Sequence, residues 1–118
     1  MTTNVPKIVE GEIIFRQIPT SFSGATVFIF LEDNNRADAP SVVVARSVLH
    51  GISRSPENIS SIHFRIVHPS PDSNAQLAIS IHIDVDGDGK ISPGDFITME
   101  SFPVTGNNPL AVYVQRVG

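Results

Sequence analysis

The chain has 118 residues, 41% of them hydrophobic and 17% charged, which suits one domain with its own core and excludes a disordered chain. Eight lysines and arginines against twelve aspartates and glutamates give a net charge of -4, and the basic residues are dispersed along the sequence, which argues against a nucleic-acid partner. The absence of cysteine excludes disulfides, thiolate nucleophiles and cysteine-ligated zinc.

Apolar runs rich in valine, isoleucine and phenylalanine, separated by proline and glycine, predict β-strands. No long window has apolar residues at helical spacing without a proline or glycine interrupting it, so we expect essentially no helix. In chain order the predicted strands are 8–17, 25–33, 41–49, 60–67, 76–84, 95–103 and 110–117. They predict a single all-β domain over residues 1–118, a seven-stranded antiparallel Greek-key sandwich of immunoglobulin or transthyretin-like type.

Three of these runs carry further information about faces. Run 25–33 is apolar on both faces, which is typical of a central strand whose outer side is covered. Runs 60–67 and 76–84 alternate with a period of two, so one face is predicted to be core and the other to meet water. The predicted core residues are Ile62, Phe64, Ile66, Leu77, Ile79, Ile81 and Ile83; the predicted solvent-facing residues are His63, Arg65, Ser80, His82 and Asp84.

An acidic segment at 84–95 matches the EF-hand calcium loop at several positions. Alternate residues of a tightly turned segment aim their carboxylates inward, Gly89 permits the sharp bend, and the following backbone carbonyl can then face an ion. Calcium requires six to eight such oxygen ligands. We therefore predict a Ca²⁺ site formed by Asp84, Asp86, Asp88, the backbone of Lys90, Ser92 (through a water) and Asp95.

The alternative is that this segment is a plain hairpin turn, because Asp-Gly pairs favour hairpins. A turn accounts for the glycines but leaves unexplained why four aspartates occur within twelve residues. Two carboxylates ~4 Å apart repel by roughly 4 kcal/mol at an effective dielectric of ~20, so their convergence calls for a cation. The flanking segments are predicted strands, so a structural or buffering ion is favoured over a helix-opening switch.

Leu-Glu-Asp at 31–33, Arg-Ala-Asp-Ala-Pro at 36–40, the strand at 76–83 and Ser-Phe-Pro-Val-Thr at 101–105 resemble the YbaY-like lipoproteins. That family includes the lipoprotein pilotins, which are secretin chaperones, of type III secretion. The resemblance spans roughly residues 9–117 and implies a small β-sandwich, no catalytic activity and, for pilotin members, binding of a secretin segment. Segment 36–40 is either a partner-binding feature or, as we favour, a turn closed by Pro40.

The remaining signals concern catalysis, location and partner. His50, His63, His68 and His82 lie in no catalytic or metal-binding motif, so we expect no enzyme, although a hydrolase site assembled in space is a third hypothesis. A hairpin of runs 60–67 and 76–84 would place His63 opposite His82 as a surface metal pair; solvated histidines are the favoured interpretation. No run approaches the ~20 apolar residues of a membrane span. As written the chain suits the cytoplasm, and an extracytoplasmic site if a leader precedes it.

Two functions therefore lead the predictions from sequence. The first is a non-enzymatic calcium-binding β-sandwich that acts as a protein-interaction module. The alternative is a pilotin-like chaperone that binds a secretion-system component, with the acidic loop a plain hairpin. Calcium affinity favours the first, and a groove or apolar patch beside the sheet favours the second.

Overall fold

The computed structural model describes residues 7–16, 21–34, 41–55, 61–68, 76–104 and 109–118, and within these ranges it contains strands and no helix, so none that could span a lipid bilayer. The all-β prediction is therefore confirmed. The strands are β1 (Lys7–Phe15), β2 (Phe22–Asp33), β3 (Val42–Arg54), β4 (Ile62–His68), β5 (Leu77–Asp84), β6 (Phe96–Ile97), β7 (Phe102–Pro103) and β8 (Leu110–Arg116).

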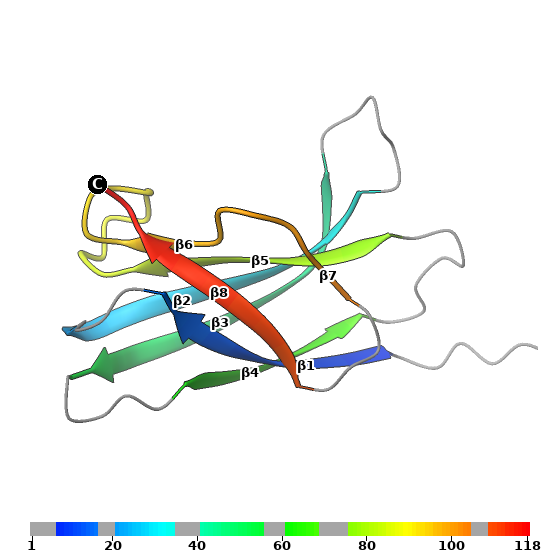
Figure 1. Ribbon diagram of the computed structural model, residues 1–118, viewed down its shortest axis with the longest axis horizontal. Helices are drawn as coiled ribbons and strands as arrows, with labels where there is room; N and C mark the ends of the chain where they lie inside the picture. Colours follow the sequence, from blue (N-terminus) through cyan, green and yellow to red (C-terminus); the bar gives the residue numbers. More distant parts are fainter. Residues whose placement is uncertain (1–6, 17–20, 35–40, 56–60, 69–75, 105–108) are drawn as a thin grey trace, which may run out of the picture.

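The strands form one continuous sheet in the order β3-β2-β5-β6-β8-β1-β4, with β7 beside β5 (Figure 1). This sheet curves back on itself, so that its end strands β3 and β4 approach each other, and the fold is a nearly closed, barrel-like sheet. This single curved sheet leaves the predicted Greek-key sandwich unconfirmed, and two further details differ from the sequence prediction. Run 95–103 is two short strands, β6 and β7, both paired with β5. The sheet is also not wholly antiparallel, because β1 and β8, which no tight turn connects, run parallel.

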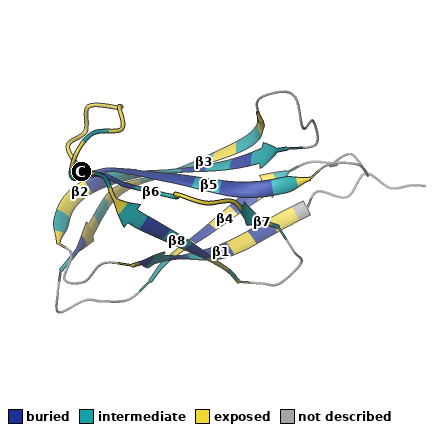
Figure 2. Ribbon diagram, turned by 45° about the horizontal axis from the view of Figure 1, so that its top comes forward, coloured by how far each residue is buried: buried dark blue, intermediate teal, exposed yellow. Residues whose placement is uncertain are grey.

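The interior of the sheet holds the hydrophobic core (Figure 2). Alternate residues of β2 point inward and are fully buried, as a period of two requires. At one end of the core Phe15, Phe22 and Phe96 form an aromatic cluster, with the Phe15 and Phe96 rings in an edge-to-face contact at 5.2 Å. The Arg54 guanidinium covers Phe15 at 4.2 Å from the ring centroid, and burial lowers the pKa of Arg54.

The predicted faces of β4 and β5 are confirmed on their inner sides. Phe64 and Ile66 of β4 are buried, as are the three isoleucines of β5, whereas His63 and Arg65 are exposed. Ile62 and Leu77, also predicted to be core, are half-buried and pack against it. The prediction is wrong for the outer side of β5, because His82 is only 8% exposed and Asp84 only 3%. The covering group is the loop that follows β5, which folds back over these two side chains.

The hairpin of runs 60–67 and 76–84, which would have placed His63 opposite His82, does not form, because β4 and β5 do not pair. β4 pairs with β1, which places His63 opposite Glu12. β5 pairs with β2, which places His82 opposite Phe28, and the two rings stack at 5.7 Å. His82 is thus part of the cover predicted for the outer side of β2. Segment 36–40 lies outside the described residues.

Candidate functional site

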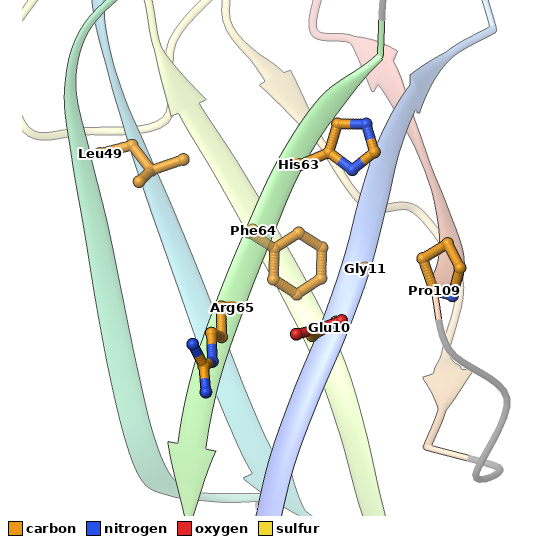
Figure 3. Close-up of a pocket in the computed structure, with 7 residues that line it drawn as sticks. All are labelled: Glu10, Gly11, Leu49, His63, Phe64, Arg65 and Pro109. Atoms are coloured by element: carbon orange, nitrogen blue, oxygen red, sulfur yellow. The ribbon is translucent and has the colours of Figure 1, made fainter.

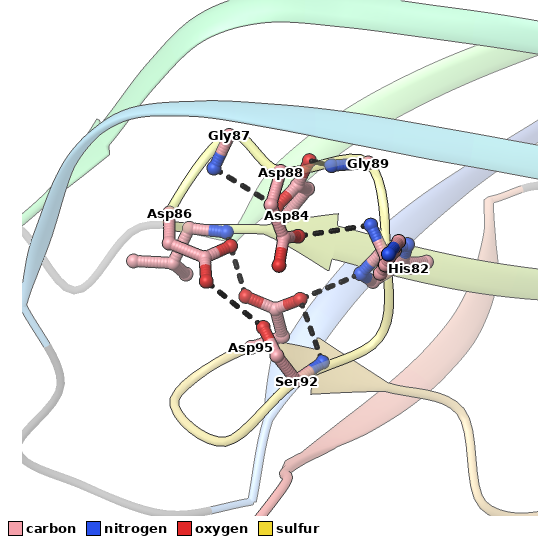
Figure 4. Close-up of polar contacts among 10 residues, drawn as sticks. His82, Asp84, Asp86, Gly87, Asp88, Gly89, Ser92 and Asp95 are labelled. Carbon is pink, nitrogen blue, oxygen red and sulfur yellow. Dashed lines mark hydrogen bonds and ion pairs between the residues drawn. The ribbon is translucent and has the colours of Figure 1, made fainter.

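The acidic loop, residues 85–95 together with Asp84, connects β5 to β6 (Figure 4). The two strands pair antiparallel, with Ile83 opposite Phe96, so the loop closes a hairpin at one end of the sheet. Gly87 and Gly89 adopt φ angles of 77° and 75°, which residues other than glycine rarely adopt. These two bends turn the loop back toward β5, as the sequence predicts for Gly89.

Asp84 ends β5 and is almost completely buried. Its Oδ1 accepts a hydrogen bond of 3.0 Å from the backbone N–H of Gly87, and its Oδ2 accepts one of 2.9 Å from that of Gly89. Charge-assisted bonds from backbone N–H groups offset part of the cost of burying a carboxylate. Asp84 therefore organises the first half of the loop.

Asp95 organises the second half and is fully buried, with 0% exposure. Its Oδ1 accepts a bond of 2.9 Å from the backbone N–H of Val85, and its Oδ2 accepts one of 3.3 Å from that of Ser92. The Nε2 of His82 lies 2.8 Å from the same Oδ2. No sequence motif pointed to this third contact, because His82 reaches the loop only through the fold of the hairpin.

The other two aspartates of the loop are exposed. Asp86 accepts a hydrogen bond of 2.9 Å from the Ser92 hydroxyl, and this bond lowers the pKa of Asp86. Asp88 accepts one of 2.9 Å from the backbone N–H of Lys90. The structure thus brings together all of the predicted side-chain carboxylates, because one oxygen from each of Asp84, Asp86, Asp88 and Asp95 lies within 4.8 Å of the others.

This arrangement offers hard oxygen ligands of the kind Ca²⁺ prefers, and it also limits how they can be used. The Asp95 carboxylate already accepts from three protein donors, so a bidentate grip on an ion requires some of these contacts to lengthen. The Ser92 hydroxyl donates to Asp86, so its lone pairs could still accept from the bridging water that the calcium prediction requires. The donor set fits calcium, with Asp95 the ligand that must adjust.

A second candidate site is the β3–β4 groove, an open pocket of about 620 Å³ between the two end strands of the sheet (Figure 3). Leu49 of β3 lies on one side, and the ring of Phe64 on β4 lies on the other. The complete lining is Glu10, Gly11, Leu49, His63, Phe64, Arg65 and Pro109.

Gly11 lets the Phe64 ring approach the backbone of β1 closely. The two residues are register partners of β1 and β4, and a Cβ at position 11 would lie 2.6 Å from Phe64 Cε2 and 2.9 Å from the Leu110 carbonyl oxygen. Only a glycine allows so close an approach. Sequence reasoning missed the groove, although a glycine within a strand pattern is the signal that marks such contacts.

Two of the histidines considered for catalysis have carboxylate partners. The Nε2 of His82 contacts buried Asp95, and that of His63 lies 3.5 Å from Glu12 on the exposed side of β1. His50 is exposed on β3, and His68 ends β4. His63 and His68 are five residues apart on β4, so they point to opposite faces of that strand, and His50 and His82 lie on β3 and β5. Among the described residues the four histidines therefore form no common site.

The fold and the two sites define a small barrel-like β domain with an acidic hairpin loop and an open groove. No protein-family model matches the chain, and no curated protein does. Among solved structures, the domain is similar to an alternative pilotin from the type II secretion system of Vibrio cholerae, with a TM-score of 0.74. That match has 20% sequence identity and covers 97% of this chain and 99% of the pilotin. The shared feature at this identity is the fold.

Proposed function

We propose that this protein is a non-enzymatic, pilotin-like chaperone that binds a segment of a secretion-system component, for which the sequence resemblance implies a secretin. The observation that carries the proposal is the likeness of fold to a pilotin over nearly the whole of both chains. The β3–β4 groove adds an opening with apolar side chains at which a protein segment can dock. This is the alternative function from the sequence, which the comparison favours over a calcium protein.

The test is direct binding of the purified protein to overlapping peptides that tile the secretin of the same cells, measured by calorimetry. We expect one segment to bind with a Kd in the micromolar range or tighter, and a scrambled version of that segment not to bind. Deleting the gene should reduce the amount of assembled secretin in those cells. If no segment binds and assembly is unchanged, the pilotin-like function is refuted.

We also propose, as a second function, that the acidic loop holds a structural Ca²⁺ ion. The observation in its favour is the convergence of carboxylate oxygens from Asp84, Asp86, Asp88 and Asp95. Calcium at a hundredfold excess over Kd would stabilise the fold by about 2.7 kcal/mol. Because Asp95 must loosen its protein contacts, we expect a weak site, with a Kd of about 10⁻⁶ to 10⁻⁴ M.

The calcium test is thermal denaturation of the protein freed of metal by chelation, with added CaCl₂ or MgCl₂. Calcium should raise Tm by several degrees and magnesium much less, because magnesium sheds its waters reluctantly. Asp86→Asn should weaken the calcium effect, because it removes the charge of one of the converging carboxylates. Asp86 is exposed, so this change leaves the hydrogen bonds of Asp84 and Asp95 intact. Glu100→Gln, an exposed carboxylate outside the loop, is the matched control. An unchanged Tm at millimolar calcium would leave only the plain hairpin.

A further inference from the structure

The β3–β4 groove lies between two strands that each have one strand neighbour. Among the described residues β3 pairs only with β2, and β4 pairs only with β1. An end strand presents backbone N–H and C=O groups on its outer side, which another segment can pair with. The register of β3 with β2 shifts at Val44, between Val43 and Ala45, and the φ of 66° at Gly51 interrupts the strand geometry again. The regular edge available for pairing is therefore residues 45–50 of β3, together with β4.

These two strands also concentrate positive charge in an acidic protein. They carry Arg46, Arg54 and Arg65 and three of the four histidines, and they contain no aspartate or glutamate, whereas the chain as a whole has a net charge of -4. Arg54 is buried against Phe15. Arg46 and Arg65 are exposed, one on each side of the groove, and Arg65 is among the lining residues.

The surroundings of these arginines differ on the two strands. In the sheet register Arg46 stands opposite Phe30 of β2, while Arg65 stands opposite Glu10 of β1. Of the two arginines, therefore, only Arg65, on the β1 side of the groove, has a carboxylate residue as its register partner. The apolar groups at the opening, Leu49 and Phe64, lie between the two charged positions.

We propose that the β3–β4 groove takes an extended, acidic segment of a partner protein by strand addition, with its backbone hydrogen-bonded to the edges of β3 and β4. The pairings around the sheet make β3 and β4 run in opposite directions, so the segment lies antiparallel to one edge and parallel to the other. Its apolar side chains contact Leu49 and Phe64, and its carboxylates face Arg46 and Arg65. The inference rests on the proposed chaperone function and names the class of segment bound.

A second copy of this chain is a poorer occupant on electrostatic grounds. Pairing β3 with β3 of another copy sets Arg46 and His50 against the same basic strand, and like charges across a strand pair are unfavourable. Pairing β3 with β4 of another copy again brings arginine toward arginine. An acidic segment meets both edges with opposite charge.

The test uses a short synthetic probe in which valine and glutamate alternate, matched in length to β4, and a second probe with lysine in place of glutamate. Binding is followed by amide shifts and Kd in ¹⁵N–¹H NMR spectra of the intact protein. We expect the glutamate probe to bind and to shift amides of β3 and β4, and the lysine probe to bind at least tenfold more weakly. Arg46→Glu and Arg65→Glu should each raise the Kd of the glutamate probe by about two- to fivefold, which is the effect of losing a partly exposed ion pair.

Backbone pairing is tested by methylating alternate amides of the probe in its two possible phases. A strand held between two edges donates to β3 from one set of amides and to β4 from the other, so both phases should lose most of the affinity. Arg116→Glu, an exposed arginine of β8, is the matched control and should leave binding unchanged. Dispersed NMR spectra of each variant confirm that it is folded.

Several outcomes would overturn the proposal: binding that tolerates both methylation phases, equal binding of the lysine probe, shifts confined to other strands, or dimerisation of the free protein through β3. The tiled secretin peptides distinguish a failure of strand addition from a failure of the proposed chaperone function. A secretin segment whose binding ignores the Arg46→Glu and Arg65→Glu changes overturns strand addition and leaves the chaperone function standing. If no secretin segment binds and secretin assembly is unchanged without the gene, the chaperone function falls, and the probe titration alone decides the groove.

Discussion

Replacing Gly11 by alanine tests how the floor of the β3–β4 groove is built. Gly11 faces Phe64 across the β1–β4 pair, and an added Cβ lies 2.6 Å from Phe64 Cε2 and 2.9 Å from the Leu110 carbonyl oxygen. Ordinary contacts of this kind are at least 3.4 Å. The Phe64 ring must therefore move by nearly 1 Å, and the backbone of β8 must also yield slightly.

The cost follows from crowding a buried ring. Phe64 is 5% exposed and packs within the core, so its ring can retreat only toward the groove that it lines. Inserting a methyl group into such a site costs about 1–3 kcal/mol. Phe64→Leu removes the ring atoms that clash, so Gly11→Ala should cost about 1–2 kcal/mol less in the Phe64→Leu background. The remaining cost is not zero, because the Leu110 carbonyl oxygen still opposes the new Cβ.

Urea denaturation of the two single variants and the double variant, followed by circular dichroism, measures this coupling. With an m value of about 1–3 kcal/mol/M, a loss of about 2 kcal/mol lowers the midpoint by roughly 1 M. Gly11→Ala should also shift the amides around the groove in NMR spectra. Equal costs of Gly11→Ala in both backgrounds, or a stabilised Gly11→Ala variant, would show that the ring does not rest on Gly11.

Three further outcomes are expected of variants elsewhere in the chain. His82→Phe keeps the stack on Phe28 but removes one partner of buried Asp95, so thermal denaturation should show a loss of about 1–3 kcal/mol; an unchanged Tm would contradict this. Ser92→Ala should raise the pKa of Asp86 toward its ordinary value in metal-free buffer, measured by NMR titration, because the Ser92 hydroxyl holds it down. Val43→Lys changes a β3 side chain that is 50% exposed, so thermal denaturation should show a change in stability of less than about 0.5 kcal/mol, and a larger loss would show that the side chain is covered.

The strands were predictable from the sequence because their signals are local. Alternation in runs 60–67 and 76–84 correctly gave the inner residues Phe64, Ile66 and the isoleucines of β5. The pairing was not predictable in the same way, because it depends on which strands meet in space. β4 joins β1 and not β5, and β8 joins β1 in parallel, although neither pair is adjacent in the sequence.

The acidic loop was predictable in composition but not in its environment. Aspartate and glycine spacing indicated converging carboxylates, and the structure brings these carboxylates together. The burial of Asp84 and Asp95 and the contact of Asp95 with His82 come from the loop folding over β5, which spacing does not encode. The groove was hardly predictable, because its lining residues come from strands that are separate in the sequence. The one signal for it in the sequence is the glycine at position 11 within a strand pattern.

The two proposed functions occupy separate parts of the molecule and share no residue. The acidic loop joins β5 to β6, whereas the groove is lined from β1, β3, β4 and Pro109. β8 links them, since it pairs with β6 through Arg116 and Gln115 and with β1 through residues 110–114. Its inward residues Val112 and Val114 are fully buried, so β8 has no room to shift when the loop binds an ion. Calcium should therefore change the stability of the protein without changing the affinity of the groove, and a coupling between the two would require, by reciprocity, that the bound segment also alter calcium affinity.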